Sequence, residues 1–355
     1  MTSRERLLTA IHRGTPDRVP IGPYTLGRLD FDAPFTREFI RAVDPLVDTG
    51  CGGNMIWGQS APFEKLPLEH VRDQVVEVIV LHTPKGNLLR KTRRTKIMTS
   101  QTEFFCKTPE DAEKVLSVPF TPPSFNLKEY FRQRESVGDE GLVLIGIPDG
   151  ICWVAELYSP EDFSMLWIDA PDVMRKLVRT AADRINAATE ELAKSGVEAF
   201  RIVGGEYASV QLGPTAFEEL VVEPDAELCD IIRKNGAVSY FHNHGPVTRY
   251  YDAFRRIGMD ALDPLEAPPW GDCDLAEAKR RIGSDICMVG NLDDMEILEK
   301  LPWEEIEPIA RERLSAGGPD AFIFGGTASG TYTEIGARNF MRLVPLAEEM
   351  VGRWV

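Results

Sequence analysis

The chain has 355 residues, of which 43% are hydrophobic and 27% are charged, and its formal net charge is −16. This acidic balance argues against nucleic acid as a partner, because phosphate binding requires a basic surface. No apolar run reaches the ~18 residues of a membrane helix, and the N-terminal segment MTSRERLLTAIHRG lacks the apolar core of a signal peptide. The six cysteines are scattered and form no C-x-x-C pair, so we expect a cytoplasmic protein without a structural zinc finger.

The N-terminal part of the chain predicts helices that alternate with short strands. Ser3 is suited to cap the first helix, because its hydroxyl can accept a hydrogen bond from a free backbone N–H. The expected elements are a helix over residues 4–13, a strand over 18–24, a helix near 35–43 and a strand over 54–58. Two alternating runs, 75–82 and 87–93, then flank Pro84-Lys85-Gly86 and predict a β-hairpin. We weigh two roles for it, a lid over a site and a cover for a sheet edge.

From residue 142 onward, strands and helices alternate regularly. The run 142–147 is continuously apolar, which is typical of a strand covered on both faces. The expected strands number eight and lie near residues 20, 56, 144, 201, 240, 261, 288 and 322. We therefore predict an α/β fold, a single (β/α)8 TIM barrel over residues 1–355, with an N-terminal helical extension and the inserted hairpin near its mouth. The alternative, an open doubly wound sheet, is weakened because no G-x-G-x-x-G follows the first strand.

Two of the five histidines stand at the end of one predicted strand, in His242-Asn243-His244-Gly245. Ligands bind at the carboxyl ends of strands in α/β sheets and barrels. In an extended strand the side chains of His242 and His244 project to the same side. They can therefore converge on one metal ion, or they can bind an anionic substrate without a metal. Ordinary loop histidines beside a turn glycine are the third interpretation.

Other ionisable and amide side chains follow the remaining strands. Because barrel enzymes carry their catalytic residues at these ends, we interpret Asp149 and Glu206 as catalytic. The residues interpreted as substrate-binding are Tyr207, Asn243, Asn291 and Thr327. Helix capping or loop polarity explains each residue singly, but explains the whole ring less well. The chain has no G-x-S-x-G and no Walker A loop, so nothing indicates a serine hydrolase or an NTPase.

Several motifs together resemble the uroporphyrinogen decarboxylase superfamily, over nearly the whole chain. They are Thr15-Pro16-Asp17-Arg18-Val19-Pro20, Gly204-Gly205-Glu206, Tyr240-Phe241-His242-Asn243-His244-Gly245, and Gly290-Asn291-Leu292-Asp293 after the spacer 272–279. The resemblance implies a single (β/α)8 barrel. It also implies one of three activities: a cofactor-free decarboxylase, a zinc-dependent methyltransferase that uses methylcorrinoid, or a barrel like that of cobalamin-independent methionine synthase.

The branch motifs favour the methyltransferases over the decarboxylases. The decarboxylase branch carries P-x-W-x-M-R-Q-A-G-R, and of its arginines this chain retains only Arg28. The methyltransferase branch carries H-x-C where this chain has His242-x-His244, and its later cysteine has no counterpart in Gly325-Gly326-Thr327. Glu266 lies 22 residues beyond His244, near the offset of a ligand in the methionine synthases. The resemblance thus implies zinc at His242, His244 and Glu266, a more Lewis-acidic centre than one with thiolates.

We therefore expect a metal-dependent methyltransferase that acts on a small methylated substrate, with a corrinoid protein as its partner. The alternative is a cofactor-free decarboxylase of uroporphyrinogen or of a smaller acid. In that case Arg28 would hold a carboxylate, and Asp149 or Glu206 would act as the acid or stabilise charge. A binding barrel without activity is disfavoured, because the strand ends are rich in ionisable groups. Since the arginine-rich run is missing, we expect no efficient decarboxylation of uroporphyrinogen.

Overall fold

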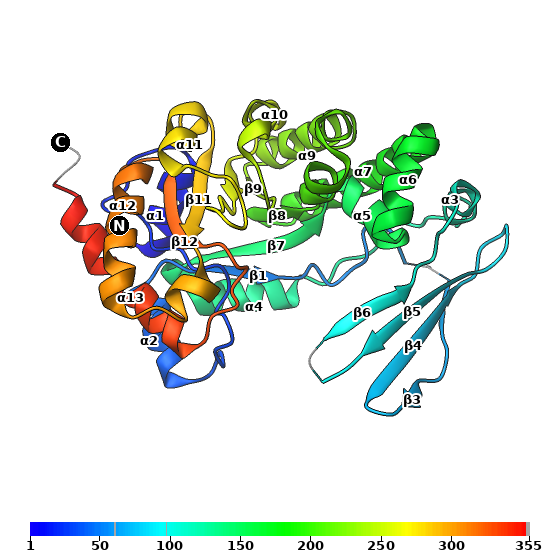
Figure 1. Ribbon diagram of the computed structural model, residues 1–355, viewed down its shortest axis with the longest axis horizontal. Coiled ribbons are helices and arrows are strands. Elements are labelled where there is room, and N and C mark those ends of the chain that lie inside the picture. The colour runs from blue at the N-terminus through cyan, green and yellow to red at the C-terminus, as the bar shows by residue number, and fades with distance from the viewer. Residues whose placement is uncertain (60–61, 97, 353–355) are drawn as a thin grey trace.

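The computed structural model describes residues 1–59, 62–96 and 98–352, and it has an α/β fold with two sheets (Figure 1). The larger sheet is parallel, and its strands in spatial order are β1 (Leu46–Thr49), β7 (Leu142–Pro148), β8 (Ala199–Val203), β9 (Val238–His242), β10 (Ala261–Asp263), β11 (Cys287–Leu292) and β12 (Phe322–Gly326). The helices are α1 (Ser3–Ile11), α2 (Pro34–Ala42), α3 (Pro109–Leu116), α4 (Lys128–Val137), α5 (Gly150–Leu157), α6 (Pro160–Asp169), α7 (Pro171–Lys194), α8 (Pro214–Phe217), α9 (Glu223–Lys234), α10 (Tyr251–Ile257), α11 (Leu275–Ile282), α12 (Trp303–Gly317) and α13 (Glu334–Met350). In the part of the chain described, no helix is both long and apolar enough to cross a membrane.

The parallel sheet has seven strands where the sequence predicts eight. The segment predicted as the first strand makes only isolated parallel bridges, from Ile21 to Phe324 of β12 and from Tyr24 to Leu46 of β1. It therefore links the two edge strands of the curled sheet. Pro20 and Pro23 lie in this segment and have no N–H to donate, so a continuous ladder cannot form there.

The prediction of a strand over residues 54–58 is wrong. These residues form a turn, in which the Asn54 side chain accepts hydrogen bonds from the backbone N–H groups of Ile56 and Trp57. Asparagine favours such turns because its side chain mimics a backbone carbonyl. The strand at this place in the sheet is β1, earlier in the chain.

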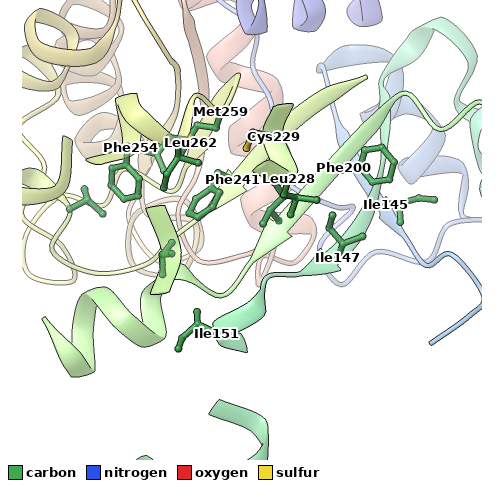
Figure 2. Packing of buried hydrophobic residues seen from close by; sticks show 14 of the residues in the cluster. Ile145, Ile147, Ile151, Phe200, Leu228, Cys229, Phe241, Phe254, Met259 and Leu262 are labelled. Atoms are coloured by element: carbon green, nitrogen blue, oxygen red, sulfur yellow. The ribbon is translucent and has the colours of Figure 1, made fainter. Parts of the chain in front are cut away.

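Alternation along the strands creates two apolar layers, one on each face of the parallel sheet. On the inner face, Leu142 and Leu144 of β7 pack with residues of α1. The prediction of this helix is confirmed, but its N-cap is Thr2 and not Ser3. On the outer face, Ile145 and Ile147 belong to the layer that helices cover (Figure 2). A sheet buried on both faces requires the nearly continuous apolar runs seen in the sequence.

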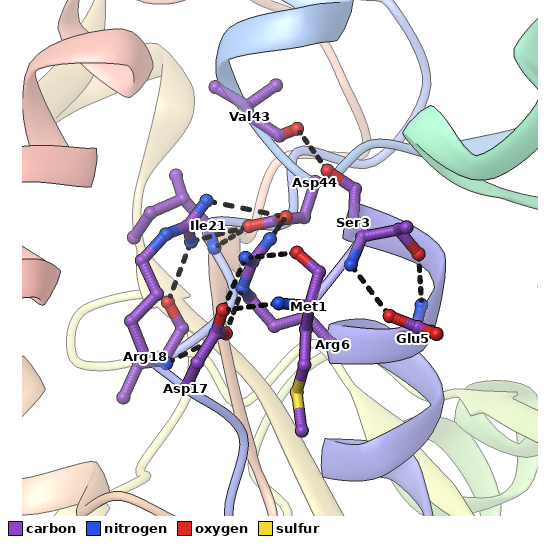
Figure 3. A network of polar contacts seen from close by, with 11 residues as sticks. Met1, Ser3, Glu5, Arg6, Asp17, Arg18, Ile21, Val43 and Asp44 are labelled. Atoms are coloured by element: carbon purple, nitrogen blue, oxygen red, sulfur yellow. Dashed lines mark hydrogen bonds and ion pairs between the residues drawn. The ribbon is translucent and has the colours of Figure 1, made fainter.

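A cluster of charges holds α1 to the amino end of the sheet (Figure 3). We call Arg6, Asp17, Arg18 and Asp44 the floor cluster. The fully buried Asp44 accepts hydrogen bonds from Arg6 Nη1 at 2.6 Å and from Arg18 Nη1 at 2.7 Å. It also accepts one from the backbone N–H of Ile21 at 2.9 Å. The carboxylate thus ties α1 to the segment that links β12 and β1.

The predicted hairpin is confirmed and belongs to a larger antiparallel sheet, which we call the inserted sheet. Its strands are β2 (Phe63–Lys65), β3 (Glu69–Val71), β4 (Gln74–Leu81), β5 (Leu88–Arg94) and β6 (Thr99–Glu103). The inserted sheet lies beside α3 and α5 and away from α12 and α13 (Figure 1). Phe63 stacks on Phe105 at 5.8 Å between ring centroids, and Trp57 lies edge-on to both Phe63 and Trp153 of α5. Aromatic contacts thus attach the inserted sheet to the helix that follows β7.

Candidate active site

Polar side chains interrupt the apolar inner face toward the carboxyl ends of the strands. We call this group the mouth cluster; its members are Tyr24, Asp48, Arg201, Tyr240 and Asp263. The Tyr24 hydroxyl donates to Asp48 Oδ2 at 2.7 Å, and the guanidinium carbon of Arg201 lies 4.3 Å from the centroid of the Tyr24 ring. Arg201 and Tyr240 are register partners on β8 and β9, so their side chains lie on the same face of the sheet.

Three buried atoms of the mouth cluster, Arg201 Nε, Asp48 Oδ1 and the Tyr240 hydroxyl, have no hydrogen-bond partner among the described residues. Burial acts to lower the pKa of Arg201, but the negative charges nearby, led by Asp263, outweigh it and the pKa is raised. The guanidinium therefore stays charged. A buried polar group without a partner costs about 1–3 kcal/mol. Unmet donors and acceptors at the ends of parallel strands indicate a place where a ligand binds.

Each of the two neighbouring histidines is held by a carboxylate on the next strand or loop. His242 Nδ1 lies 2.6 Å from Asp263 Oδ1, and both side chains are buried. Burial acts to raise the pKa of Asp263, but His242 and the Arg201 charge lower it, so this carboxyl is ionised. An ionised carboxylate only accepts, so His242 Nδ1 carries the proton and donates.

His244 is held in the same way, with Nδ1 3.0 Å from Glu266 Oε1. Burial acts to lower the pKa of His244, whereas the hydrogen bond to Glu266 raises it, and the net shift is upward. The rings of His242 and His244 are perpendicular, with centroids 4.5 Å apart. In both residues a carboxylate fixes the ring orientation. This leaves Nε2 of His242 as the ring nitrogen available to a substrate, whereas Nε2 of His244 lies 3.3 Å from Ser329 Oγ.

The three residues predicted as zinc ligands lie together but do not present three free donors. Glu266 uses Oε1 for His244 and Oε2 to accept the backbone N–H of Gly245 at 2.7 Å. Within the described ranges, no three His, Cys, Asp or Glu side chains are placed to hold a metal ion together. As arranged, this set does not fit a three-ligand zinc site, and the metal remains a prediction from the sequence.

The predicted acids Asp149 and Glu206 lie beside a third carboxyl, Asp225 of α9. Asp149 Oδ1 accepts from the backbone N–H of Cys152 at 2.8 Å and thereby caps α5. The carboxyls of Asp149 and Asp225 interact with each other, and burial raises the pKa of both, so the pair retains a proton. A Cβ on Gly204 would lie 1.8 Å from Asp149 Oδ1, which explains the glycine there. Among the described residues, Glu206 Oε2 and Asp149 Oδ2 are both buried without a hydrogen-bond partner.

The amide side chains predicted to bind substrate also support the loops in which they stand. Asn243 Nδ2 donates to Ser209 Oγ at 3.1 Å, and Asn291 Nδ2 donates to the backbone carbonyl of Leu265 at 2.7 Å. Their Oδ1 atoms are buried without partners, so both keep a free acceptor. Tyr207 begins a π-helical turn, and burial raises its pKa to about 12.

Thr327 and Arg28, two other predicted site residues, lie apart from the mouth cluster. Thr327 shares a separate cavity of about 450 Å³ with Asn291 and Trp270. Arg28 is exposed, its backbone N–H donates to the carbonyl of Tyr332, and its charge acts on Glu299. The structure thus does not place Arg28 beside Arg201.

From the sequence, Arg201 has a role only as a substitute for the missing arginines of the decarboxylase branch, and the other members of the mouth cluster have none. One signal was available, because Arg201 is the only charged residue in the apolar strand predicted at 199–203. A buried charge in such a strand indicates either an ion pair or a ligand site. Asp48 carried no comparable signal, since the strand that contains it was not predicted.

Known proteins match the chain in both sequence pattern and fold. The family model described as "Uroporphyrinogen decarboxylase (URO-D)" matches residues 153–350. The fold is similar to that of a methyltransferase from Methanosarcina mazei, at 15% sequence identity and a TM-score of 0.65, covering 98% of each chain. A B12-independent methionine synthase from Shewanella sp. W3-18-1, in complex with selenomethionine, matches at 11% identity and a TM-score of 0.44, covering 97% of this chain and 96% of that one. No curated protein sequence matches the chain.

Proposed function

The chain belongs to the uroporphyrinogen decarboxylase (URO-D) family, and from this premise we propose that it is a methyltransferase. It takes the methyl group of a small methylated substrate and passes it to a corrinoid carried by a partner protein. The observation that carries this proposal is the His242–Asp263 hydrogen bond of 2.6 Å beside the buried, charged Arg201. This arrangement places an acid–base group and a fixed positive charge at one point of the inner face.

Methyl transfer needs both of these groups. The methyl carbon would receive an electron pair from the methyl acceptor, the reduced corrinoid, as its bond to the heteroatom breaks. The electron pair of the broken bond stays on the heteroatom, which becomes negative as the methyl group departs. Arg201 stabilises this negative charge in a site from which water is largely excluded. His242, when it carries a proton on Nε2 as well as on Nδ1, then gives the Nε2 proton to the heteroatom. Asp263 keeps the ring in position and stabilises its charged form, as carboxylates do for catalytic histidines.

Zinc stays a prediction, and no step above depends on it. Elemental analysis of protein purified without chelator, as wild type and as His244→Ala, tests it. Zinc that is present in the wild type and lost in the variant supports the predicted ligands. A wild type that neither contains nor takes up zinc rejects them, and zinc that survives the substitution places the metal elsewhere.

Decarboxylation is the alternative, and the free Nε of Arg201 is the observation that favours it. A buried arginine binds a substrate carboxylate through charge-assisted hydrogen bonds. In that case the bond from carbon to the carboxylate breaks, carbon dioxide leaves, and His242 or Glu206 protonates the carbanion. We still expect no efficient decarboxylation of uroporphyrinogen. Anaerobic incubation with uroporphyrinogen III tests this, and ready formation of coproporphyrinogen would contradict it.

Free cob(I)alamin as methyl acceptor tests the main proposal. Anaerobic mixtures of the protein, cob(I)alamin and one methylated compound at a time (alcohols, thioethers, amines and aryl methyl ethers) are followed by absorbance for methylcob(III)alamin. We expect turnover with at least one class and a loss of about 100-fold in His242→Gln, the size typical of a removed acid–base group. His12→Gln, which changes an exposed histidine of the floor side, is the control. Carbon dioxide release from organic acids, with no methylcob(III)alamin from any donor, would establish the alternative.

A further inference from the structure

A cavity of about 480 Å³ lies between the inserted sheet, α5 and the carboxyl half of β7. Trp57, Phe63 and Trp153 form its aromatic part. The Trp57 ring lies edge-on to the other two, with centroid distances of 5.1 Å to Phe63 and 5.4 Å to Trp153. Cavities of about 300–1,000 Å³ with aromatic walls and a few polar groups are typical of small-molecule sites.

The polar groups of this cavity that lack a hydrogen-bond partner are of one kind. Among the described residues that line it, the buried side-chain nitrogens and oxygens without a partner are Arg90 Nε and Trp153 Nε1, and both are N–H donors. Trp153 is only 1% exposed. Among the carboxylates of the lining, Glu77 pairs with Lys65 at 3.6 Å. Burial raises the pKa of Glu156, whereas the nearby Arg90 charge acts to lower it. Neither carboxylate accepts a hydrogen bond from Arg90 Nε or Trp153 Nε1, so a ligand anion would supply the missing acceptor.

The inner end of the cavity reaches the mouth cluster. Gly146 of β7 lines the cavity and is the register partner of Arg201. A Cβ on Gly146 would lie 3.1 Å from Asp48 Oδ1, one of the three atoms of the mouth cluster without a hydrogen-bond partner among the described residues. The absence of a side chain at this position leaves room beside Asp48. The cavity thus has Arg90 in its lining at the inserted sheet and borders the mouth cluster at Gly146.

We propose that the cavity binds the non-reacting part of the substrate, and that this part is an aromatic ring that carries a carboxylate. The ring packs against Trp57 and Trp153, since aromatic pairs prefer offset or edge-on contact. The carboxylate accepts hydrogen bonds from Arg90 and from the Trp153 indole. The opposite end of the ring then presents its methyl-bearing heteroatom to Arg201 and His242. The orientation of the methyl-bearing end rests on the proposed methyl transfer. The binding of the ring and its carboxylate in the cavity does not depend on that reaction.

Binding of 4-methoxybenzoate to the full chain, measured by calorimetry and by tryptophan fluorescence, tests the proposal. We expect Arg90→Gln and Trp57→Leu each to raise the Kd by at least about 10-fold, as the loss of a charge-assisted contact or of an aromatic wall does. Arg90→Lys, which keeps the charge but loses the planar fork, should fall between wild type and Arg90→Gln. The matched control is Lys91→Gln, the next residue on β5, whose side chain pairs with Glu103 at 3.0 Å; its Kd should stay within about 2-fold of wild type.

Three outcomes overturn the proposal. They are no binding of 4-methoxybenzoate to the wild type, equal binding to wild type and Arg90→Gln when circular dichroism shows both folded, and preferential binding of benzyltrimethylammonium. The last would mean that the aromatic walls and Glu156 select a cation. If 4-methoxybenzoate binds as expected but no methyl transfer from it is observed, the binding site is supported and only the proposed reaction is rejected.

Discussion

A buried arginine lies at each end of the parallel sheet, and the two differ in how many of their hydrogen bonds the protein supplies. In the floor cluster, Arg6 bonds to Asp17, to Asp44 and to the carbonyl of Met1. In the mouth cluster, Arg201 is 8% exposed like Arg6, yet its Nε has no partner. Burial is equal, so the difference lies in how completely each charge is satisfied by the protein. The floor cluster therefore stabilises the fold, whereas the mouth cluster retains hydrogen-bonding groups that can bind a ligand.

The largest expected effect is at the floor. Asp44→Ala removes the shared acceptor of Arg6 and Arg18 and leaves both guanidiniums buried in its absence. We expect a loss of about 3–5 kcal/mol in the free energy of unfolding, the cost of breaking a buried ion pair from one side. Urea denaturation at neutral pH measures it. A loss below about 1 kcal/mol would mean that the floor cluster is no more than a surface ion pair.

Arg201→Met at the mouth is the matched change, and it should affect activity rather than stability. The free energy of unfolding should stay within about 1 kcal/mol of wild type, because the change removes the buried, unpartnered Nε donor and puts an apolar side chain of similar length in its place. We expect kcat/KM for methyl transfer to fall about 100-fold, as for the loss of one preorganised stabilising group. Arg18→Met is the control with the reverse pattern. A destabilised Arg201→Met with normal kcat/KM would assign Arg201 to the fold.

The carboxyl pair Asp149 and Asp225 makes stability depend on pH. Burial raises the pKa of both groups in the folded protein, so the pair keeps a proton that an unfolded chain releases above about pH 4. Stability therefore falls as pH rises above that value, by up to about 1.4 kcal/mol per pH unit for each proton retained. Asp225→Asn should flatten this slope between pH 5 and 8. Parallel curves for the two proteins would show that the pair does not hold the proton.

The smallest expected effect is again at the floor. The Asp17 side chain is 41% exposed, and Arg6 retains Asp44 when Asp17 is removed. Although the hydrogen bond from Arg6 lowers the pKa of Asp17, solvent screens the pair. Asp17→Ala should therefore cost less than about 1 kcal/mol in urea denaturation. A cost as large as that of Asp44→Ala would mean that the exposed edge, and not the buried carboxylate, holds the cluster together.

The sequence predicts those parts of the molecule in which local pattern and tertiary role coincide. The regular strands from β7 to β12, the hairpin of β4 and β5, and the polar residues at the strand ends follow from apolar period and turn residues. The strand at 54–58 was mistaken because Met55, Ile56 and Trp57 are apolar, while the turn depends on the Asn54 side chain. A local pattern does not distinguish an apolar turn that packs under an inserted sheet from a strand.

The site was harder to predict, because its chemistry depends on which atoms face each other across strands. The spacing of His244 and Glu266 correctly brings them together, but it does not say that the carboxylate bonds the imidazole Nδ1 and Gly245. In the same way, nothing in the strand at 199–203 reveals whether Arg201 meets a carboxylate. Only the register of β8 with its neighbours shows that its Nε stays free.

The segment that links the edge strands has a consequence for the order of folding. It joins the start of the chain to its end, since Ile21 bridges Phe324, and the Tyr332 hydroxyl donates to the carbonyl of Thr25 at 2.9 Å across 307 positions of sequence. These contacts cannot form until the ribosome has released nearly the whole polypeptide. Contacts between such distant positions slow folding, because a long loop must close first. The N-terminal segment therefore stays without these contacts until β12 and the residues after it have been synthesised. A chain truncated before β12 would leave the inner face exposed and prone to aggregation.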